Sequence, residues 1–348
     1  MATDPDRFLK TYLDRWNVPD QIDSQGKFLV LGPKGSGKSA AANFVGLTWI
    51  RKYGEHAVFR TTVDFDELNR TQSPLYSLDK KLVSQEVTAL TDSAWKLFIG
   101  VRLLDSLAED NACSLGKDPQ LLRLLQDLKT AGLASDDYPQ VLRRVRERKG
   151  TISIPKFLSG ELKSTETDSL GPGQLGDAII GLVTKAGTPN RHILAIDGLD
   201  KAIGENDTYW RTLAALVRVG DTVTRRLREE GNRSVYIVIM CRTDVFRRIS
   251  FADSAKIAAD SGIHIAWGAE MQNPREVALW EYVAQKAQVD PDELIACLPD
   301  HLKVGRGRGK RIASMQYILQ FTRYTPRDIE PPLHRNPGKS SQFGTRKR

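Results

Sequence analysis

The feature that most constrains the fold is the segment FLVLGPKGSGKSA at residues 28–40. An apolar run precedes a glycine-rich stretch, and Gly32, Gly37, Lys38 and Ser39 complete the spacing G-x-x-x-x-G-K-[ST]. This spacing predicts a strand, a phosphate-binding loop and the first turn of a helix. Because a strand that leads into a helix is the repeating unit of α/β proteins, the segment favours a parallel sheet covered by helices.

The residue types in this segment suit a polyphosphate that carries several negative charges. Glycines let the backbone wrap a phosphate with no side chain in the way, and a helix N-terminus adds unpaired N–H groups. We expect Lys38 to reach the β- and γ-phosphates and the Ser39 hydroxyl to bind Mg²⁺. The alternative is a glycine-rich turn without a ligand. The expected nucleotide-binding residues are Gly32, Pro33, Lys34, Gly35, Ser36, Gly37, Lys38, Ser39 and Ala40.

A carboxylate for the metal ion is expected at the end of a second buried strand. The run RHILAI at 191–196 holds consecutive apolar residues, which is typical of a strand buried on both faces, and Asp197 follows it. Ligands of parallel sheets bind at the carboxyl ends of strands, so Asp197 is the candidate Mg²⁺ ligand. Asp200, three residues further on, is the candidate to orient an attacking water; its alternative is a helix N-cap.

A third apolar run, at 235–240, leads into Cys241, Arg242, Thr243 and Asp244. If this strand lies between the first two, Arg242 emerges beside the γ-phosphate, where it would stabilise charge in the transition state. The alternative is an ion pair of Arg242 with Asp244 or Asp197. The candidate catalytic residues are therefore Lys38, Asp200 and Arg242.

The order of these motifs resembles the ATPases of the STAND and AAA+ type. The chain is most similar to small bacterial STAND-like P-loop ATPases, on the loop, the DGLD at 197–200, the CRTD at 241–244 and the PRDI at 326–329. The resemblance covers residues 20–330. It implies a three-layer α/β fold with a mostly parallel five-stranded sheet, in which one strand separates the strands of the loop and of Asp197. ATP and Mg²⁺ are the implied cofactors.

The same resemblance implies a small helical region from which Arg327 approaches the phosphates as a second sensor. An ion pair of Arg327 with Asp328 is the alternative. Such ATPases are often regulatory switches, and some act in defence against phage. Hydrolysis is expected to be slow or partner-dependent, because Gly198 stands where many AAA+ and ABC sites have a glutamate directly after the metal aspartate.

The pattern of apolar residues predicts how the chain is organised. We expect a nucleotide-binding core at 1–270 with a helical insertion at about 66–190, a helical lid at 271–330 and a disordered basic tail at 331–348. Asp118 and Pro119 would begin one inserted helix, with four leucines on its buried side. The insertion is a candidate docking surface for a neighbouring subunit or a client protein. The four leucines are Leu121, Leu122, Leu125 and Leu128.

Composition adds an expected compartment and a second class of partner. The 348 residues carry a net charge of +8, three cysteines and no apolar run long enough to cross a bilayer, so we expect a cytoplasmic protein. The basic clusters at 143–146 and 225–228 fit solvated helix faces. The glycine-interleaved cluster at 305–311 predicts a flexible cationic loop, and together with the tail it is a candidate for contact with nucleic acid.

The sequence thus predicts an ATPase that binds ATP and ADP, hydrolyses slowly and acts as a regulatory or assembly switch, with a homo-oligomer as one candidate assembly. Two alternatives stay open. One is a nucleic-acid-binding module that uses nucleotide only for structure. The other is an ABC-type ATPase, suggested by the sequence LGPGQ at 170–174.

Overall fold

The computed structural model divides into two compact units. The C-terminal unit comprises Met1–Arg15, Gly32–Lys38 and Ile265–Arg348; the sheet unit comprises Trp16–Leu31 and Ser39–His264. The described residues are 4–64, 84–116, 118–134, 138–147, 152–153, 169–199, 207–249, 251–268, 271–304 and 310–329.

The sheet unit is built on five parallel strands in the order β2-β5-β6-β1-β7. The central strands form because nearly every side chain along them is apolar and buried on both faces, as parallel sheets require. The predicted α/β fold with a five-stranded sheet is confirmed, and β6 lies between β1 and β5 as the resemblance implied. The strands are β1(Leu29–Gly32), β2(Val58–Asp64), β5(Arg191–Asp197), β6(Val235–Arg242) and β7(Gly262–His264).

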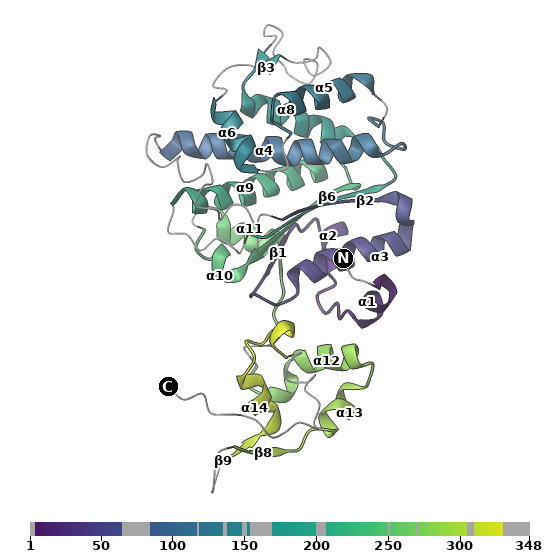
Figure 1. Ribbon diagram of the computed structural model, residues 1–348, viewed down its shortest axis with the longest axis vertical. Helices are drawn as coiled ribbons and strands as arrows, with labels where there is room; N and C mark the ends of the chain where they lie inside the picture. Colours follow the sequence, from purple (N-terminus) through teal and green to yellow (C-terminus); the bar gives the residue numbers. More distant parts are fainter. Residues whose placement is uncertain are drawn as a thin grey trace. The chain divides into compact units, whose positions relative to one another are not determined.

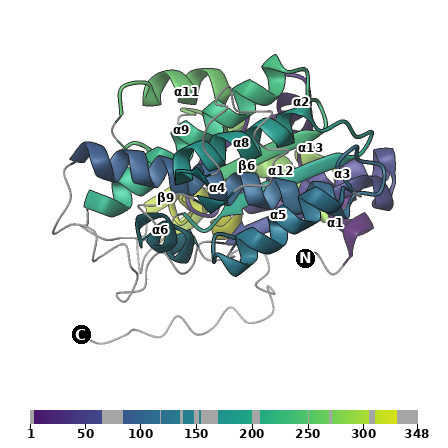
Figure 2. The same ribbon diagram turned by 90° about the horizontal axis from the view of Figure 1, so that it is seen from above.

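Helices cover both faces of this sheet (Figure 1). On one side lie α4(Ser84–Glu109) and α9(Asp207–Glu229); α3(Lys38–Tyr53) lies on the other side. Figure 2 shows the same structure from above. The buried indole of Trp95 on α4 donates a hydrogen bond to the carbonyl of Thr212 on α9 at 2.9 Å, which fixes the two helices to each other.

The residues between β2 and β5 include α4, α5(Pro119–Thr130), α6(Tyr138–Glu147) and α8(Pro172–Lys185), and the short pair β3(Ile152–Ser153) and β4(Ser169–Leu170). These helices share one continuous apolar core with the sheet. Asp118 caps α5 as predicted, because its carboxylate accepts from the backbone N–H of Gln120. Leu122 was predicted wrongly: it is 52% exposed, and Leu124 is buried instead.

Shorter elements complete the sheet unit. They are α2(Val18–Asp23), the 3-10 turn η1(Glu55–Ala57), α10(Thr243–Phe246) and α11(Ser254–Ser261).

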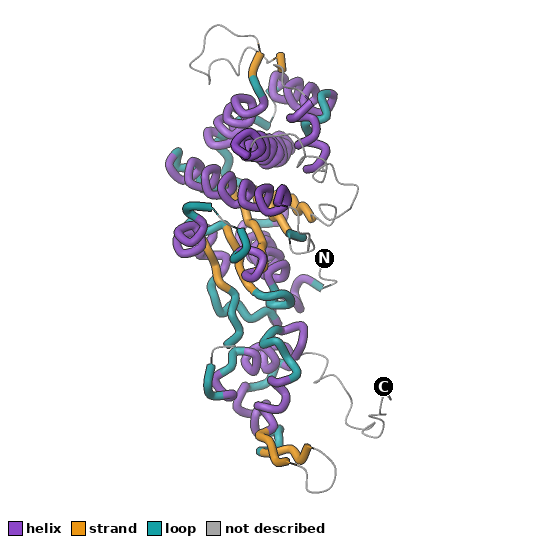
Figure 3. The backbone as a smooth tube through the Cα atoms, turned by 90° about the vertical axis from the view of Figure 1, so that its left-hand side faces the viewer, coloured by secondary structure: helices purple, strands orange, loops and turns teal. Residues whose placement is uncertain are grey.

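The C-terminal unit combines short helices with a β-hairpin (Figure 3). Its elements are α1(Pro5–Thr11), the 3-10 turn η4(Pro274–Glu276), α12(Leu279–Ala287), α13(Pro291–Ala296), β8(His301–Val304), β9(Lys310–Ala313) and α14(Ser314–Gln320). The N-terminal segment joins α12 through an Arg15–Glu281 ion pair at 2.6 Å. The hairpin corrects the sequence prediction, because Lys310 and Arg311 belong to a strand rather than to a loop. The predicted tail at 331–348 lies outside the described residues.

None of the helices within the described ranges combines the length and the apolar character that crossing a bilayer requires.

Candidate functional site

The glycine-rich loop at 32–38 follows β1 and leads into α3, as predicted. Gly35 and Gly37 have positive φ angles of +84° and +96°, a region that side-chain-bearing residues rarely adopt. The loop therefore turns in a way that only glycine permits without strain. Backbone N–H groups in such a turn, followed by a helix N-terminus, form a concavity suited to anions.

Lys38 folds back over this loop. Its ammonium donates to the carbonyl oxygens of Gly32 at 3.2 Å and Pro33 at 3.1 Å, and the residue is only 8% exposed. The positive charge is thus held at the loop rather than in solvent. A buried ammonium group attracts an anion at the loop more strongly than an exposed ammonium group would, because less water screens the two charges from each other.

Ser36 supplies a second observation that points to a ligand of the loop. Its hydroxyl is buried and has no hydrogen-bond partner among the described residues, although buried polar atoms are nearly always paired. The carbonyl of Ser36, in contrast, accepts from the indole of Trp267 at 2.8 Å. The loop is therefore anchored through its backbone, while one of its hydroxyl groups is left available.

Arg327 lies against the same loop, within the C-terminal unit. Its backbone N–H points to the carbonyl of Gly35 at 3.5 Å, and a Cβ on Gly35 would come within 3.0 Å of the Cβ of Arg327. The alternative of an Arg327–Asp328 ion pair is not what the structure contains, because Asp328 pairs with Arg323 at 2.9 Å. The Arg327 side chain is exposed. Its role as a sensor stays a prediction.

Ser39 and Asp197 come together in the sheet unit, although they are 158 residues apart. The Ser39 hydroxyl donates to Oδ2 of Asp197, and the N–H of Gly198 donates to Oδ1 at 2.8 Å. Ser39 is the second residue of α3, and Asp197 is the last residue of β5. A hydroxyl and a carboxylate in contact are two oxygen ligands of the kind that Mg²⁺ takes from proteins.

Arg242 ends β6, the strand between β5 and β1. Its guanidinium forms a two-pronged ion pair with Asp244, at 2.9 Å and 2.5 Å, and this pairing lowers the pKa of the Asp244 carboxyl. Of the two interpretations drawn from the sequence, the ion pair with Asp244 is therefore present. For Arg242 to contact a phosphate, its guanidinium would have to separate from Asp244 or bind both groups at once.

One acidic residue at this edge of the sheet was missed by the sequence analysis. Asp64 ends β2, and in the parallel register it stands directly opposite Asp197. Both strands thus end in aspartate at the same position, a repetition visible in TTVD and LAID once the two strands are known to pair. Asp200, the predicted water-orienting residue, lies outside the described residues.

The donor set fits a hard cation that a phosphate and water would complete. Within the described parts of the chain, no group of three or more His, Cys, Asp or Glu side chains is arranged to hold a metal ion by itself. Mg²⁺ does not need such a cage, because it usually binds one or two protein oxygens together with substrate phosphates. Within the sheet unit, Ser39 and Asp197 would hold such an ion.

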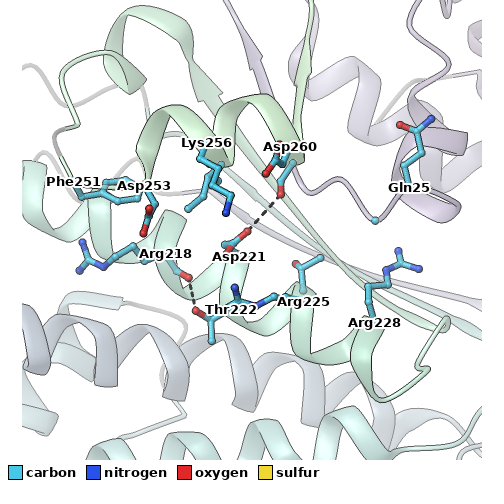
Figure 4. Close-up of a pocket in the computed structure, with 14 residues that line it drawn as sticks. Gln25, Arg218, Asp221, Thr222, Arg225, Arg228, Phe251, Asp253, Lys256 and Asp260 are labelled. Atoms are coloured by element: carbon cyan, nitrogen blue, oxygen red, sulfur yellow. Dashed lines mark hydrogen bonds between the residues drawn. The ribbon is translucent and has the colours of Figure 1, made fainter.

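A separate cavity of about 540 Å³ lies at the opposite edge of the sheet, between α9, α11 and the residues before β1 (Figure 4). Its charged side chains are of both signs, and burial raises the pKa of Asp221, whose carboxylate lies 3.4 Å from the Ser261 hydroxyl. Because cations and anions line the cavity together, it has no dominant charge. The charged residues are Arg218, Arg225, Arg228, Lys256, Asp221, Asp253 and Asp260.

A third polar cluster surrounds His192 near the start of β5. His192 contacts the Asp110 carboxylate through Nε2 at 3.2 Å and the Ser106 hydroxyl through Nδ1 at 2.9 Å. The other oxygen of Asp110 accepts from the Asn190 amide at 2.8 Å and from the backbone N–H of Ala112 at 2.8 Å. All three side chains of this Ser–His–Asp set are buried.

Comparisons with protein-family models, with curated proteins and with solved structures found no match to this chain. The assignment of a function therefore depends on the sequence motifs and on the geometry described above.

Proposed function

We propose that this protein binds ATP with Mg²⁺ at the glycine-rich loop and hydrolyses it slowly, as a regulatory or assembly switch. The observation that carries the proposal is the contact between Ser39 and Asp197. It joins the last position of the loop motif to the carboxyl end of a second buried strand. Ser39 and Asp197 were each predicted from the sequence to bind the same metal ion, and they are in contact although they are far apart in the sequence.

Three further features support the binding of a polyphosphate. The loop has the positive φ angles of an anion-binding turn, Lys38 holds its charge beside the loop carbonyls, and the Ser36 hydroxyl lacks a partner among the described residues. Because Lys38 and Ser39 are consecutive in α3, a cation site for phosphate and an oxygen ligand for a metal are one peptide bond apart.

In the proposed reaction the protein supplies positioning and charge. Bound Mg²⁺ would neutralise the developing charge on the phosphoryl group, with Ser39 and Asp197 as its protein ligands. Lys38 would contribute a fixed positive charge. Asp64 and Asp200 are the two candidates to orient water. An aspartate on the neighbouring strand would compensate for the glycine at position 198, where many such sites have a glutamate.

The proposal is tested by removing the loop cation. Lys38→Ala should weaken binding of a fluorescent ATP analogue roughly 10- to 100-fold, because a charge-assisted hydrogen bond contributes about 1.5–3 kcal/mol. Size-exclusion measurements with ATP and ADP would show at the same time whether assembly depends on the nucleotide.

Lys52→Ala is the matched control, since Lys52 lies in the last turn of the same helix and carries the same charge. It should bind ATP like the original protein. Equal affinities of the Lys38→Ala variant, the Lys52→Ala variant and the original protein would contradict the proposal.

A further inference from the structure

The positive charge of the chain is concentrated in two stretches near its C-terminus. Residues 301–313 and 331–348 together carry ten Lys and Arg residues and no Asp or Glu, whereas the whole chain has a net charge of +8. The remainder of the protein is therefore net acidic, and the basic character belongs to these stretches. The ten residues are Lys303, Arg306, Arg308, Lys310, Arg311, Arg335, Lys339, Arg346, Lys347 and Arg348.

The first stretch contains the antiparallel hairpin of β8 and β9, whose register fixes where its cations point. Lys303 pairs directly with Arg311, and His301 pairs with Ala313, so these four residues share one face. His301, Lys303 and Arg311 are exposed. The opposite face carries Leu302, Val304 and Ile312, each of them partly buried, and the exposed Lys310 at its end. The hairpin thus has an apolar inner face and a cationic outer face.

The pairing of Lys303 with Arg311 is unfavourable for the hairpin on its own. Like charges directly opposite each other on neighbouring strands repel. No acidic side chain among the described residues forms an ion pair with either cation. On α6, in contrast, Arg143 and Arg144 both pair with Glu147, at 2.7 Å and 3.2 Å. Among the described residues, the hairpin therefore keeps a pair of cations without an acidic partner, whereas Arg143 and Arg144 share one carboxylate.

We propose that the outer face of the β8–β9 hairpin binds the phosphate backbone of a nucleic acid. Phosphates spaced along a strand would supply the missing negative charge to Lys303 and Arg311 together, with release of counterions. A two-stranded ribbon also matches the width of the major groove of a duplex.

A nucleic acid fits this face better than an anionic membrane does. A basic residue alone contributes only about 1 kcal/mol at an anionic membrane surface, and amphipathic segments that bind such a surface also place apolar side chains among the lipid tails. The outer face offers only Ala313 as an apolar residue, while the larger apolar side chains of the hairpin point to the other face. The recognition is therefore electrostatic, and it does not depend on base sequence.

The test is fluorescence anisotropy of the full chain with labelled mixed-sequence oligonucleotides of about 20 nucleotides, both single- and double-stranded, over a range of KCl concentrations. We expect binding that weakens steeply with salt. The double substitution Lys303→Gln with Arg311→Gln should weaken binding about tenfold or more at 0.1 M salt and reduce the salt slope by about two. Its melting temperature should be unchanged or higher, because the repulsion between the strands is removed.

Arg143→Gln with Arg144→Gln is the matched control, since it removes the same charge from two exposed arginines that already share the Glu147 carboxylate. It should change oligonucleotide affinity less than about twofold. Equal losses in the two double variants would overturn the proposal, and so would salt-independent binding or binding only to phosphatidylserine vesicles. Lys38→Ala should retain oligonucleotide binding, so this result and the outcome of the ATP experiment are independent.

Discussion

The two ends of strand β5 carry similar polar residues with opposite surroundings. At its start, His192 is 0% exposed and lies in a network with Asp110 and Ser106 in which both Asp110 oxygens have two partners. At its end, Asp197 is partly exposed, and each of its oxygens accepts one hydrogen bond. A carboxylate can accept about four hydrogen bonds, so the first is saturated and the second has capacity for a ligand.

This difference shows why a constellation of residue types does not by itself identify a site. Serine, histidine and aspartate in contact form the set that hydrolases use for nucleophilic attack. Here the set is enclosed, and Phe59 stacks on the imidazole with ring centroids 4.7 Å apart. The Asp110 carboxylate only accepts, so Nε2 of His192 carries the proton and Nδ1 accepts from Ser106. We therefore assign the network at the start of the strand to stability.

The largest of the expected effects, which tests the proposed difference between the two ends of β5, is on ATP hydrolysis when Asp197 is replaced. Asp197→Asn keeps the size of the side chain but weakens it as a metal ligand, and the proposed Mg²⁺-dependent ATP hydrolysis should fall on the order of 100-fold or more. The rate of phosphate release checks this, and thermal unfolding should show a folded protein.

Asp64→Asn at the paired position is the matched variant. If Asp64 orients water, the rate should fall while ATP affinity stays the same. An Asp197→Asn variant as fast as the original protein would remove Asp197 from the proposed site.

The next effect concerns the other end of the strand. Asp110→Ala removes the acceptor of four hydrogen bonds in a buried site, so the free energy of unfolding should drop by about 3 kcal/mol. Urea denaturation measures this change. Ser106→Ala, which removes one hydroxyl, should cost about 1 kcal/mol and leave ATP hydrolysis unchanged. Loss of hydrolysis in the folded Ser106→Ala variant would show that the network does more than stabilise.

The smallest of the expected effects is the change in stability with pH that arises from His192 and Asp110. Burial lowers the pKa of His192 below its ordinary 6.5, so the unfolded chain takes up that proton first, and stability should decline as the pH falls below about 6.5. Burial raises the pKa of Asp110, but hydrogen bonds from Thr188, Ala112, Asn190 and His192 lower it overall. The stabilisation that the Asp110 carboxylate provides is therefore present at pH values above its ordinary pKa of 3.8 and is lost at lower pH.

Urea midpoints measured between pH 7 and pH 3 would resolve these two stages. His192→Gln should abolish the decline in stability that begins below about pH 6.5 and keep the decline at lower pH that comes from Asp110. A variant that retained the decline between pH 7 and pH 5 would place its origin elsewhere in the protein.

The sequence predicted those parts of the fold whose signal is local. The apolar runs that became β1, β5 and β6, the cap of α5 by Asp118, and the loop motif all depend on neighbouring residues. Features set by which residues pair with each other in the folded chain were not predictable in this way. The alignment of Asp64 with Asp197, the contact of Arg323 with Asp328 and the β8–β9 register each require the folded chain.

The hairpin shows the reason most clearly. Its glycines and cations are typical of loops, and the alternation of partly buried and exposed residues along β8 covers only four positions, too few to indicate a strand. Leu122 was misassigned for a related reason: leucines are consecutive on α5, and periodicity alone did not show which of them faces the core.

The strand order also has a consequence for how the protein is made. Among the described strands, β1 has only β6 and β7 as neighbours, and β2 has only β5. A ribosome delivers β1 and β2 long before Arg191–Asp197 and Val235–Arg242, so both early strands must wait as unpaired edges. The nascent chain therefore cannot close the contact between Ser39 and Asp197 until most of its length has been synthesised.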